Sequence, residues 1–445
     1  MEISKNLLAG ALSALGKLVC RTSPVEVYRA LRIESKENQI SFQTVGLDEA
    51  ITCTLPVEGA EEFQVFVNFD DFRTLAKYSR NKSVVIGYKD GRLTVDRTPL
   101  STVNVKWPDV ATPAPEAVTA DLPENFVGML ATAAPIVNRH EYRKALQGIH
   151  LCKEGMVVTN GKELLHIPFE LGLDALTLPF PHALLATKCA EGGGLTTWRD
   201  GGRQIFSITL GHWTWTGTAL PGNYPNWRPV IPEAASLNHI VNFDDGRASQ
   251  LAIFLKNVPA NPPNNPVTLA MGDDRMTLDV VAGEMRTSVA AEFPVDWGDF
   301  EITVNQEILL RLLNEGHHRL LFGTSHSPFI ASGGIGTFVA MPLFTKPQEQ
   351  PVQPKPKEET MNEMPNVVTA PIMPSAAPKL EPETPVNPLD DLASAVDDFK
   401  TRLRAMFDES TMLSRKVKEV ALVQKQKERD FVLARRAIER IRMAI

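Results

Sequence analysis

The side chains in this sequence that could perform chemistry do not lie at catalytic spacings. His317 and His318 lack the HExxH context of a zinc protease, and the glycine runs at 192–194 and 333–336 are not followed by the Lys-Ser or Lys-Thr of a phosphate-binding loop. The chain also contains no GxSxG nucleophile elbow. We therefore expect no catalytic residues and a protein that is not an enzyme.

Histidine and cysteine, the usual ligands of a bound metal ion, are scattered as well. The spacing of His140, His150 and His166 favours separate roles over a shared metal ion, although a ligand trio is the alternative. The cysteines share the lack of any CxxC pair: Cys20, Cys53, Cys152 and Cys189. We expect small buried thiols, no metal and no cofactor. An enzyme with an unrecognised site stays open as an alternative.

Charge is distributed unevenly along the chain. The net charge is −7, from 46 Lys and Arg against 53 Asp and Glu. Residues 400–445 contain 13 Lys and Arg against 6 Asp and Glu, which gives +7, so the remainder carries −14. Because the local field of a surface matters more than the total charge, this acidic body does not exclude DNA as a partner.

The chain length of 445 residues is sufficient for about two to four domains. Its 43% apolar and 22% charged residues are typical of a globular protein with a sizeable core. No uncharged apolar run approaches the roughly 18 residues that span a bilayer. The N-terminal apolar stripe is interrupted by Lys17 and Arg21 and is not typical of a signal peptide. We expect a cytoplasmic protein with no membrane partner.

A proline-rich segment at 346–388 ends the globular part of the chain. It contains 11 of the 33 prolines and no aromatic residue. Such a composition cannot bury enough apolar surface to offset the entropy of ordering. We predict a disordered, extended linker.

A heptad pattern follows at 389–445 and predicts a long coiled-coil helix with a coiled-coil partner. Thirteen of the sixteen seam positions from Leu392 to Ile445 are apolar, without an intervening Gly or Pro. The polar seam residues Ser410, Gln424 and Lys427 would fix the register or the number of partners. A single helix packed on its own protein body is the alternative.

Residues 1–345 contain a weak internal repeat. Each unit is predicted to open with an apolar helical stripe and to continue with a strand. The stripes begin at Leu7, Phe126 and Leu237. The strands that follow span Tyr28–Ile33, Leu146–Leu151 and Leu251–Leu255.

A second half-unit of strand, short helix and hairpin begins at Phe66, Leu178 and Ile302. Turn signals such as Lys89–Gly91 and Asp200–Gly202 separate the hairpin strands. The spacing of about 110–125 residues matches one modest domain. The sequence therefore predicts an α+β fold of three repeated domains, 1–118, 119–234 and 235–345, each with two helices and antiparallel sheets.

This arrangement resembles the bacterial DNA polymerase III β subunit, the sliding clamp family. Arg143–Leu151 looks like the second-domain strand of the family, and Val158–Leu165 matches a turn that usually reads Thr-Asp-Gly-His-Arg-Leu. Gly222–Pro232 looks like the family's Gly-x-Phe-Pro-Asp-Tyr-x-x-Val-Leu-Pro junction between the second and third domains. Val339–Leu343 looks like the Val-Met-Pro-Met stretch near the end of most clamps.

The resemblance implies a clamp whose three domains form a crescent. Two chains would join head to tail into a homodimeric ring. The ring would encircle double-stranded DNA without reading its sequence and would bind DNA polymerase and a clamp loader. The chain departs from the family where Lys162 and Glu163 replace the His-Arg of the turn, and where 346–445 extend beyond the usual end. The alternative is a scaffold or assembly protein, such as a phage-encoded one, that oligomerises through the coiled-coil tail.

In the family, partner proteins insert a short peptide into a pocket between the second and third domains. The residues of this chain at the matching positions are Arg143, Leu146, Thr159, Gly161, Leu164, Pro225, Val230, Val339, Met341 and Leu343. An exposed apolar cleft that contains a methionine suits peptide docking. The alternative is that these residues form the core of a domain junction.

Basic residues on or beside the helices expected to line the ring are the candidates for phosphate contacts. They are Arg21, Arg73, Lys77, Arg80, Arg139 and Lys188. The spacing of Arg73, Lys77 and Arg80 predicts a shared helical face. Such contacts hold DNA irrespective of its sequence, and solvated surface charge is the alternative for each residue.

Overall fold

The computed structural model describes residues 1–343 apart from 59–60, 258–263, 273–274, 283–284 and 292–299. These residues belong to one compact unit, Met1–Pro351. The predicted linker at 346–388 and the predicted coiled coil at 389–445 lie outside the described residues, so both stay predictions.

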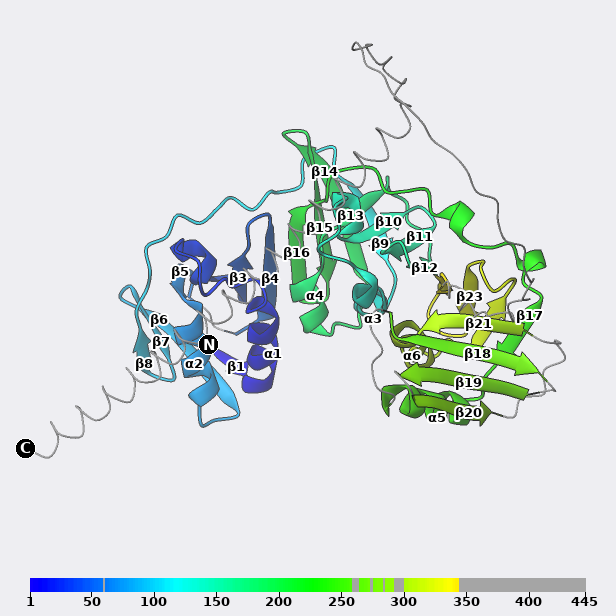
Figure 1. Ribbon diagram of the computed structural model, residues 1–445. Coiled ribbons are helices and arrows are strands. Elements are labelled where there is room, and N and C mark those ends of the chain that lie inside the picture. The colour runs from blue at the N-terminus through cyan, green and yellow to red at the C-terminus, as the bar shows by residue number, and fades with distance from the viewer. Residues whose placement is uncertain (59–60, 258–263, 273–274, 283–284, 292–299, 344–445) are drawn as a thin grey trace, which may run out of the picture. The chain divides into compact units, whose positions relative to one another are not determined.

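Three repeats with the same element order make up the described residues (Figure 1). The first contains β1 (Glu2–Ser4), α1 (Lys5–Leu15), η1 (Glu26–Arg29), β2 (Ala30–Lys36), β3 (Gln39–Val45), β4 (Glu49–Pro56), β5 (Phe63–Asn68), α2 (Phe69–Tyr78), β6 (Ser83–Lys89), β7 (Arg92–Val95) and β8 (Thr98–Leu100). The second contains β9 (Val118–Leu122), α3 (Phe126–Ala133), η2 (Ala134–Ile136), η3 (Lys144–Leu146), β10 (Ile149–Cys152), β11 (Gly155–Thr159), β12 (Glu163–Pro168), β13 (Leu176–Leu178), α4 (His182–Thr187), β14 (Gly193–Asp200), β15 (Arg203–Leu210) and β16 (Trp213–Thr218). The third, preceded by η4 (Arg228–Val230) and η5 (Ala234–Ser236), contains β17 (His239–Asn242), α5 (Asp245–Asn257), β18 (Pro266–Gly272), β19 (Arg275–Ala282), β20 (Met285–Ala291), β21 (Phe300–Asn305), α6 (Gln306–Asn314), β22 (Arg319–Phe322), β23 (Phe329–Ser332) and β24 (Thr337–Ala340).

Each repeat folds into two antiparallel four-stranded groups. In the first repeat their orders are β1-β6-β7-β8 and β5-β2-β3-β4. The second repeat gives β9-β14-β15-β16 and β13-β10-β11-β12, and the third gives β17-β22-β23-β24 and β21-β18-β19-β20. The prediction of an α+β fold with antiparallel sheets and two helices per repeat is confirmed for the described residues.

Strand pairing continues from one repeat into the next. β4 pairs with β16 over the register Glu49↔Gly217 to Cys53↔Trp213. β12 pairs with β24 over Glu163↔Ala340 to His166↔Thr337. Two eight-stranded sheets result, each shared by two repeats. Among the described residues, β8 and β20, the counterparts of these joining strands, end their own sheets instead.

Asparagine caps explain why two helices begin directly after a strand. The Asn68 side chain accepts hydrogen bonds from the N–H groups of Asp70 and Asp71 at the start of α2, and Asn305 caps α6 in the same way. An asparagine in this position satisfies N–H groups that have no partner inside the helix. The acidic residues of the first turn add a favourable interaction with the helix dipole.

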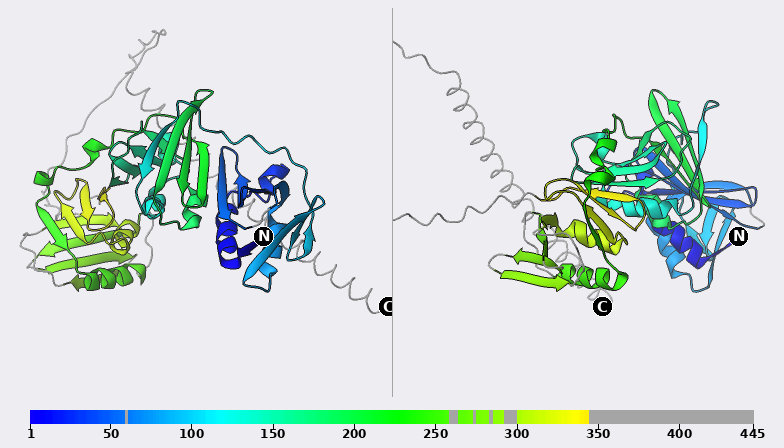
Figure 2. Two further views of the ribbon diagram at one scale, coloured as in Figure 1. Left: turned by 180° about the vertical axis from the view of Figure 1, so that it is seen from behind. Right: turned by 90° about the vertical axis from the view of Figure 1, so that its right-hand side faces the viewer.

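The core follows the apolar stripes of the sequence. On α1, Leu8, Leu12 and Leu15 are buried, whereas Leu7 is 46% exposed and belongs to the outer face. Phe42 of β3 meets Phe72 of α2 with ring centroids 5.8 Å apart. In the third repeat, α5 packs against α6 beside the β20 end of the β18–β20 strands (Figure 1 and Figure 2). In the first repeat, α1 packs against β3, β4 and β6, and α2 packs against β5, β7 and β8.

The prediction that the third repeat opens with a helix followed by a strand is wrong, because the structure has the reverse order. Leu237 leads into strand β17, and Leu251–Leu255 lies inside helix α5. Leu251 and Leu255 are one helical turn apart and are buried on the same face. The short β-branched run at Ile240 and Val241 pairs with β22, and this pairing determines its conformation. Every repeat therefore opens with a short strand followed by a helix.

The cysteines differ in burial. Cys53 and Cys152 are buried, Cys189 is half-buried and Cys20 is exposed. Burial raises the pKa of the Cys53 thiol to about 12, so it stays protonated and unreactive. The expectation of buried thiols is correct for Cys53 and Cys152 and wrong for Cys20.

Two kinds of feature are absent from the described residues. None of their helices combines the length and apolar character needed to cross a bilayer. Nowhere among them do three or more His, Cys, Asp or Glu side chains gather as ligands for a metal ion.

Candidate partner-binding site and DNA-binding residues

The turn between β11 and β12 carries the polar side of the predicted pocket. Gly161 has a φ of +84°, a conformation that favours glycine. Thr159 Oγ1 donates to the Glu163 carbonyl at 2.7 Å and accepts from the Gly161 N–H at 3.1 Å. Asn160 Oδ1 accepts from the N–H groups of Lys162 and Glu163. These local bonds are typical of turn-forming residues, so the sequence itself determines this turn.

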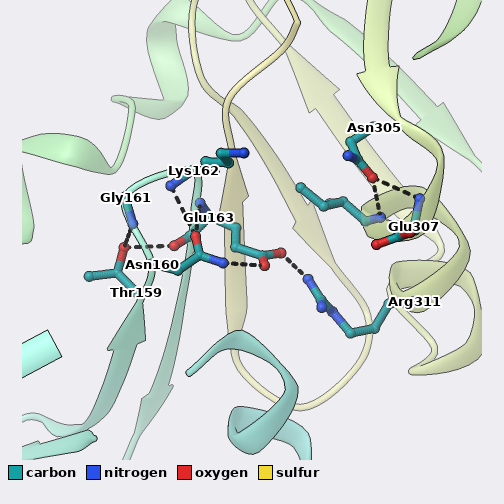
Figure 3. Close-up of polar contacts among 9 residues, drawn as sticks. Thr159, Asn160, Gly161, Lys162, Glu163, Asn305, Glu307 and Arg311 are labelled. Carbon is teal, nitrogen blue, oxygen red and sulfur yellow. Dashed lines mark hydrogen bonds and ion pairs between the residues drawn. The ribbon is translucent and has the colours of Figure 1, made fainter. Parts of the chain in front are cut away.

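A buried ion pair links this turn to the third repeat (Figure 3). One carboxylate oxygen of Glu163 contacts the guanidinium of Arg311 on α6, and the other accepts from Asn160 Nδ2 at 2.7 Å. The two ion-paired side chains are only 5% and 19% exposed. Arg311 also lies over the Phe338 ring, 5.5 Å from its centroid. Because a buried charge without a partner is costly, this pair favours one arrangement of the second and third repeats.

Two further titratable groups lie near Arg311: Glu315, which is half-buried, and His317, which is buried. Burial raises the pKa of Glu315, and the Arg311 charge opposes that rise. His317 is 0% exposed and its ring lies 5.9 Å from that of Phe338. Burial, followed by the nearby His318, lowers the pKa of His317 to about 4. His317 is therefore neutral at physiological pH and packs as part of the core.

An apolar cluster at the same junction joins the two repeats. Leu164 and Val339 are register partners of β12 and β24, and each is 2% exposed. The buried cluster is completed by Cys152, Val157 and Trp227. Half-buried side chains packed against it are Tyr224, Ile231 and Ile330.

The segment 222–231 is attached to the β10–β12 strands by two aromatic contacts. Tyr224 stacks on His150 with ring centroids 4.2 Å apart and planes 5° apart. Trp227 packs on His166 at 4.6 Å, and the Arg228 guanidinium lies 4.9 Å from the Trp227 ring. Burial, helped by Arg228, lowers the pKa of His150 to about 4. Two histidines of the alternative metal trio thus serve in packing.

The structure brings part of the predicted pocket together. The Met341 N–H donates to the Lys162 carbonyl at 2.9 Å, which places Met341 beside the turn that holds Thr159 and Gly161. The Leu343 N–H donates to the Thr303 carbonyl at 2.7 Å. Met341 and Leu343 are both half-buried. The end of β24 and the β11–β12 turn therefore form one continuous surface.

The other predicted pocket residues differ in exposure. Leu146, like Leu164 and Val339, is buried, and the last two belong to the apolar cluster of the junction. Val230 is 42% exposed, Pro225 is half-buried and Arg143 is exposed. The role of the accessible members in binding a peptide stays a prediction.

The sequence pattern did not reveal the residues that make this junction polar. Glu163 stood out only as a departure from the family turn, and Arg311 was not anticipated. Asn160 followed by Gly161 is a turn signal that was available in the sequence. The partner of Glu163, however, lies 148 residues further along the chain, and no local pattern connects the two.

Two of the predicted DNA-binding residues already have protein partners. Arg21 forms a bidentate pair with Asp70 on α2, with Nε 2.9 Å from Oδ2. Arg139 Nη1 lies 2.7 Å from His182 Nε2, and the guanidinium lies 4.4 Å from the Phe180 centroid. Burial, followed by the Arg139 charge, lowers the pKa of His182. A neutral His182 accepts the hydrogen bond of Arg139, whose exposed cation stays accessible to a phosphate.

The remaining basic candidates lie at helix α2 and at the end of α4. Arg73 and Lys77 are exposed one helical turn apart on α2. Arg80 does not share their helical face, because α2 ends at Tyr78 and the chain leaves the helix at the next residue. Lys188 is exposed directly after α4, with a φ of +54°. Since α1 packs against both α2 and α4, these cations lie around one group of helices.

The chain is similar to known DNA clamps in sequence and in fold. No model of a protein family matches the chain. A β sliding clamp of Chlamydia pneumoniae is 22% identical over 370 residues, which cover 77% of this chain and 98% of that protein. The DNA polymerase III subunit β of Pseudomonas aeruginosa bound to griselimycin aligns with a TM-score of 0.67 and 17% identity, covering 78% of this chain and 99% of that one. The Helicobacter pylori β clamp bound to a DNA ligase peptide aligns with a TM-score of 0.64 and 17% identity, covering 77% and 99%.

These likenesses are to DNA clamps, which are not enzymes, and they agree with the expectation of a non-enzymatic protein. The similarity in sequence extends over nearly the whole C. pneumoniae protein. The likeness in fold covers a similar share of this chain, with three repeats of paired helices and antiparallel strands. The chain has the fold of the bacterial DNA polymerase III β subunit and is a divergent relative of the β sliding clamps.

Proposed function

We propose that the protein is a DNA sliding clamp, a processivity factor that encircles duplex DNA as a homodimeric ring and tethers DNA polymerase. The observation that carries the proposal is the strand pairing between successive repeats. β4 pairs with β16 and β12 pairs with β24. In both cases the last strand of a repeat pairs with the corresponding meander strand of the repeat before it.

The strands that continue this pattern are β20 and β8. The Val103 N–H donates to the Phe66 carbonyl at 2.8 Å after β8, and the Leu220 N–H donates to the Thr177 carbonyl at 2.8 Å after β16. β8 therefore has the same place in its repeat as β16. If the same strand pairing is repeated between two chains, β20 of one chain pairs with β8 of the other. Two such head-to-tail contacts close a ring when the rotation permits.

The helices support the same contact. α1 of the first repeat packs against α4 of the second. The counterparts of α1 and α4 are α5 and α2, which would meet between two chains. Ile253 on α5 is 63% exposed and Tyr78 on α2 is 73% exposed. A contact between α5 and α2 of two chains would remove these two apolar side chains from water, which favours association.

DNA would be held by topology and by weak phosphate contacts. The exposed cations on and near α2 and α4 are suited to phosphate oxygens, which carry no sequence information directly. A ring that encloses the duplex needs only such contacts to remain bound while it moves.

Partner proteins, including DNA polymerase and the clamp loader, would dock at the junction of the second and third repeats. The surface there combines the accessible Met341 and Val230 with the polar β11–β12 turn. Methionine adapts to different apolar side chains, and turn polar groups can orient a peptide backbone. The H. pylori relative has been solved with a DNA ligase peptide, which supports peptide binding by this fold.

The test is retention on DNA that depends on its topology. The full chain, loaded by the clamp loader of its own cell with ATP, is expected to stay on nicked circular DNA and to be lost when that DNA is linearised. Light scattering should give the mass of two chains. A protein of two-chain mass that is never retained on circular DNA would contradict the clamp and fit the scaffold alternative.

A further inference from the structure

A groove at the junction of the first and second repeats occupies the place that corresponds to the proposed peptide pocket. At the proposed pocket, the Met341 N–H donates to the Lys162 carbonyl at 2.9 Å. At the first junction, the Thr218 N–H donates to the Asp48 carbonyl at 3.0 Å. Leu343 and Leu220 then each donate to a threonine carbonyl, at 2.7 and 2.8 Å. The two junctions therefore share one backbone pattern.

The strand registers give the same correspondence. Glu163↔Ala340 and Leu164↔Val339 at the second junction match Glu49↔Gly217 and Ala50↔Thr216 at the first. The β3–β4 turn, 46–48, thus takes the place of the β11–β12 turn, 160–162. Helix η1 precedes β2 as η3 precedes β10, and the linker after β8 takes the place of segment 222–231.

Two cavities form the groove at this first junction. One of about 200 Å³ is lined by the β3–β4 turn, the end of β16, Tyr28 of η1 and the linker residues 108–111. The other, of about 700 Å³, extends toward Leu220 and Pro221. The two share Leu47, Asp48, Glu49, Arg203 and Thr218. Leu47 is 82% exposed at this shared edge, which gives the groove an accessible apolar contact.

The smaller cavity has an excess of negative charge. Its lining contains four carboxylates and one cation: Asp48, Glu49, Asp109, Asp200 and Arg203. None of the four carboxylates forms an ion pair with another residue in the described part of the chain. A cationic group would therefore be attracted to this end of the groove.

Glu49 and its counterpart Glu163 differ in one respect. Glu163 is neutralised by Arg311. The Glu49 carboxylate instead accepts the indole N–H of Trp215, at 2.8 Å. Burial raises the pKa of Glu49, the Trp215 hydrogen bond opposes that rise, and the Asp48 charge adds to it. At the second junction, Glu163 is therefore paired with a cation of the protein itself. At the first junction, no cation among the described residues forms an ion pair with Glu49.

We propose that this groove is a second docking site, for a short extended peptide of a partner protein that carries Arg or Lys beside an apolar residue. The cation lies against Asp48 and Glu49, and the apolar side chain lies against Leu47. The inference rests on the proposed function, because the proposed peptide pocket is its template. Partners that occupy different junctions would be held on one clamp at the same time.

The experiment selects peptides on the full chain from a phage-displayed random library and measures fluorescein-labelled synthetic copies by anisotropy. We expect a set of peptides with Arg or Lys beside Leu, Ile, Val or Phe. Their Kd should rise at least tenfold in the D48N/E49Q double variant and change less than twofold in Met341→Glu, a change confined to the other junction. The amide introduced by E49Q retains an oxygen that accepts the Trp215 N–H, so an unchanged urea midpoint will confirm an intact junction.

Two results would overturn the second site. One is a selection in which no peptide depends on Asp48 and Glu49. The other is a set of dependent peptides without a basic residue. Peptides whose Kd changes only in Met341→Glu bind at the proposed pocket. The selection therefore tests the proposed pocket and the second site separately. Retention on circular DNA tests the clamp independently of both.

Discussion

At the scale of single residues, the Glu163–Arg311 pair distinguishes a buried charge from an exposed one. Both side chains lie between two repeats and have little contact with solvent. Removing one member leaves the other buried without a partner, which costs about 3–5 kcal/mol. Exposed pairs such as Arg21–Asp70, with both side chains 47% exposed, contribute only about 0–1 kcal/mol.

The first prediction follows from that contrast. Arg311→Ala should lower the free energy of unfolding by about 3–5 kcal/mol in urea denaturation, whereas Arg21→Ala should lower it by about 1 kcal/mol at most. The double variant E163L/R311M, which removes both charges, should recover part of the loss. Equal small losses for the two arginine variants would show that the buried pair does not stabilise the junction.

The second prediction concerns His317. Its pKa in the folded protein is about 4 against an ordinary 6.5, so the unfolded chain binds more protons between these values. Stability is then fully present above about pH 6.5 and declines as the pH falls toward 4. The urea midpoint should fall over this interval, and His317→Leu should make the fall shallower. A slope that is identical in the variant would contradict the assignment; His150, with a similarly lowered pKa, accounts for a remaining slope.

The residues of the candidate site were predictable only where the signal is local. The turn at Thr159–Gly161 and the apolar Leu164 could be identified from sequence, because turn residues and strand periodicity act over a few positions. The burial of Val339 and the partnership of Glu163 with Arg311 depend on which repeats meet. A single sequence does not contain that information in any local pattern.

At the scale of elements, the chain-to-chain contact should depend on α5 and β8. We predict that Ile253→Asp converts the proposed dimer to monomer at micromolar concentration, because a carboxylate would have to lose its water in the contact. Analytical ultracentrifugation measures the change. Val85→Asp is the matched control, since Val85 is 43% exposed on β6, an inner strand of its sheet. A dimer that persists in Ile253→Asp would place the interface elsewhere.

The elements themselves were predicted well where hairpins carry turn residues between alternating strands. The strand, helix and hairpin half-units beginning at Phe66, Leu178 and Ile302 all match the structure. The opening of the third repeat was mistaken, because a short apolar run such as Leu237 to Val241 fits a strand or a helix equally. Pairing with β22 makes part of this run a strand.

At the scale of the whole molecule, DNA binding should depend on salt through the exposed cations. The double variant R73A/K77A should reduce the slope of log affinity against log salt, by about 0.9 for each phosphate that the variant no longer neutralises. Anisotropy of a labelled duplex at several salt concentrations measures the slope. Lys89→Ala, at the exposed end of strand β6 and outside the helices, should leave it unchanged. An unchanged slope in R73A/K77A would exclude both residues from the DNA contact.

The tail should be dispensable for assembly of the ring. A chain that ends at Leu343 retains β8, β20, α2 and α5, which carry the proposed contact. We expect it to have the same dimer mass as the full chain in light scattering. A monomeric mass for the shortened chain would show that residues beyond Leu343 supply the association.

The short edge strand β8 has a consequence for how DNA enters. β16 joins its neighbour over five register pairs and β24 over four. β8 is three residues long, and one of them, Pro99, has no N–H to donate. Within a ring of such chains, the seam between two copies would be the weakest of the three kinds of junction. A clamp loader would therefore open the ring at this seam, while the two junctions inside each chain stay rigid.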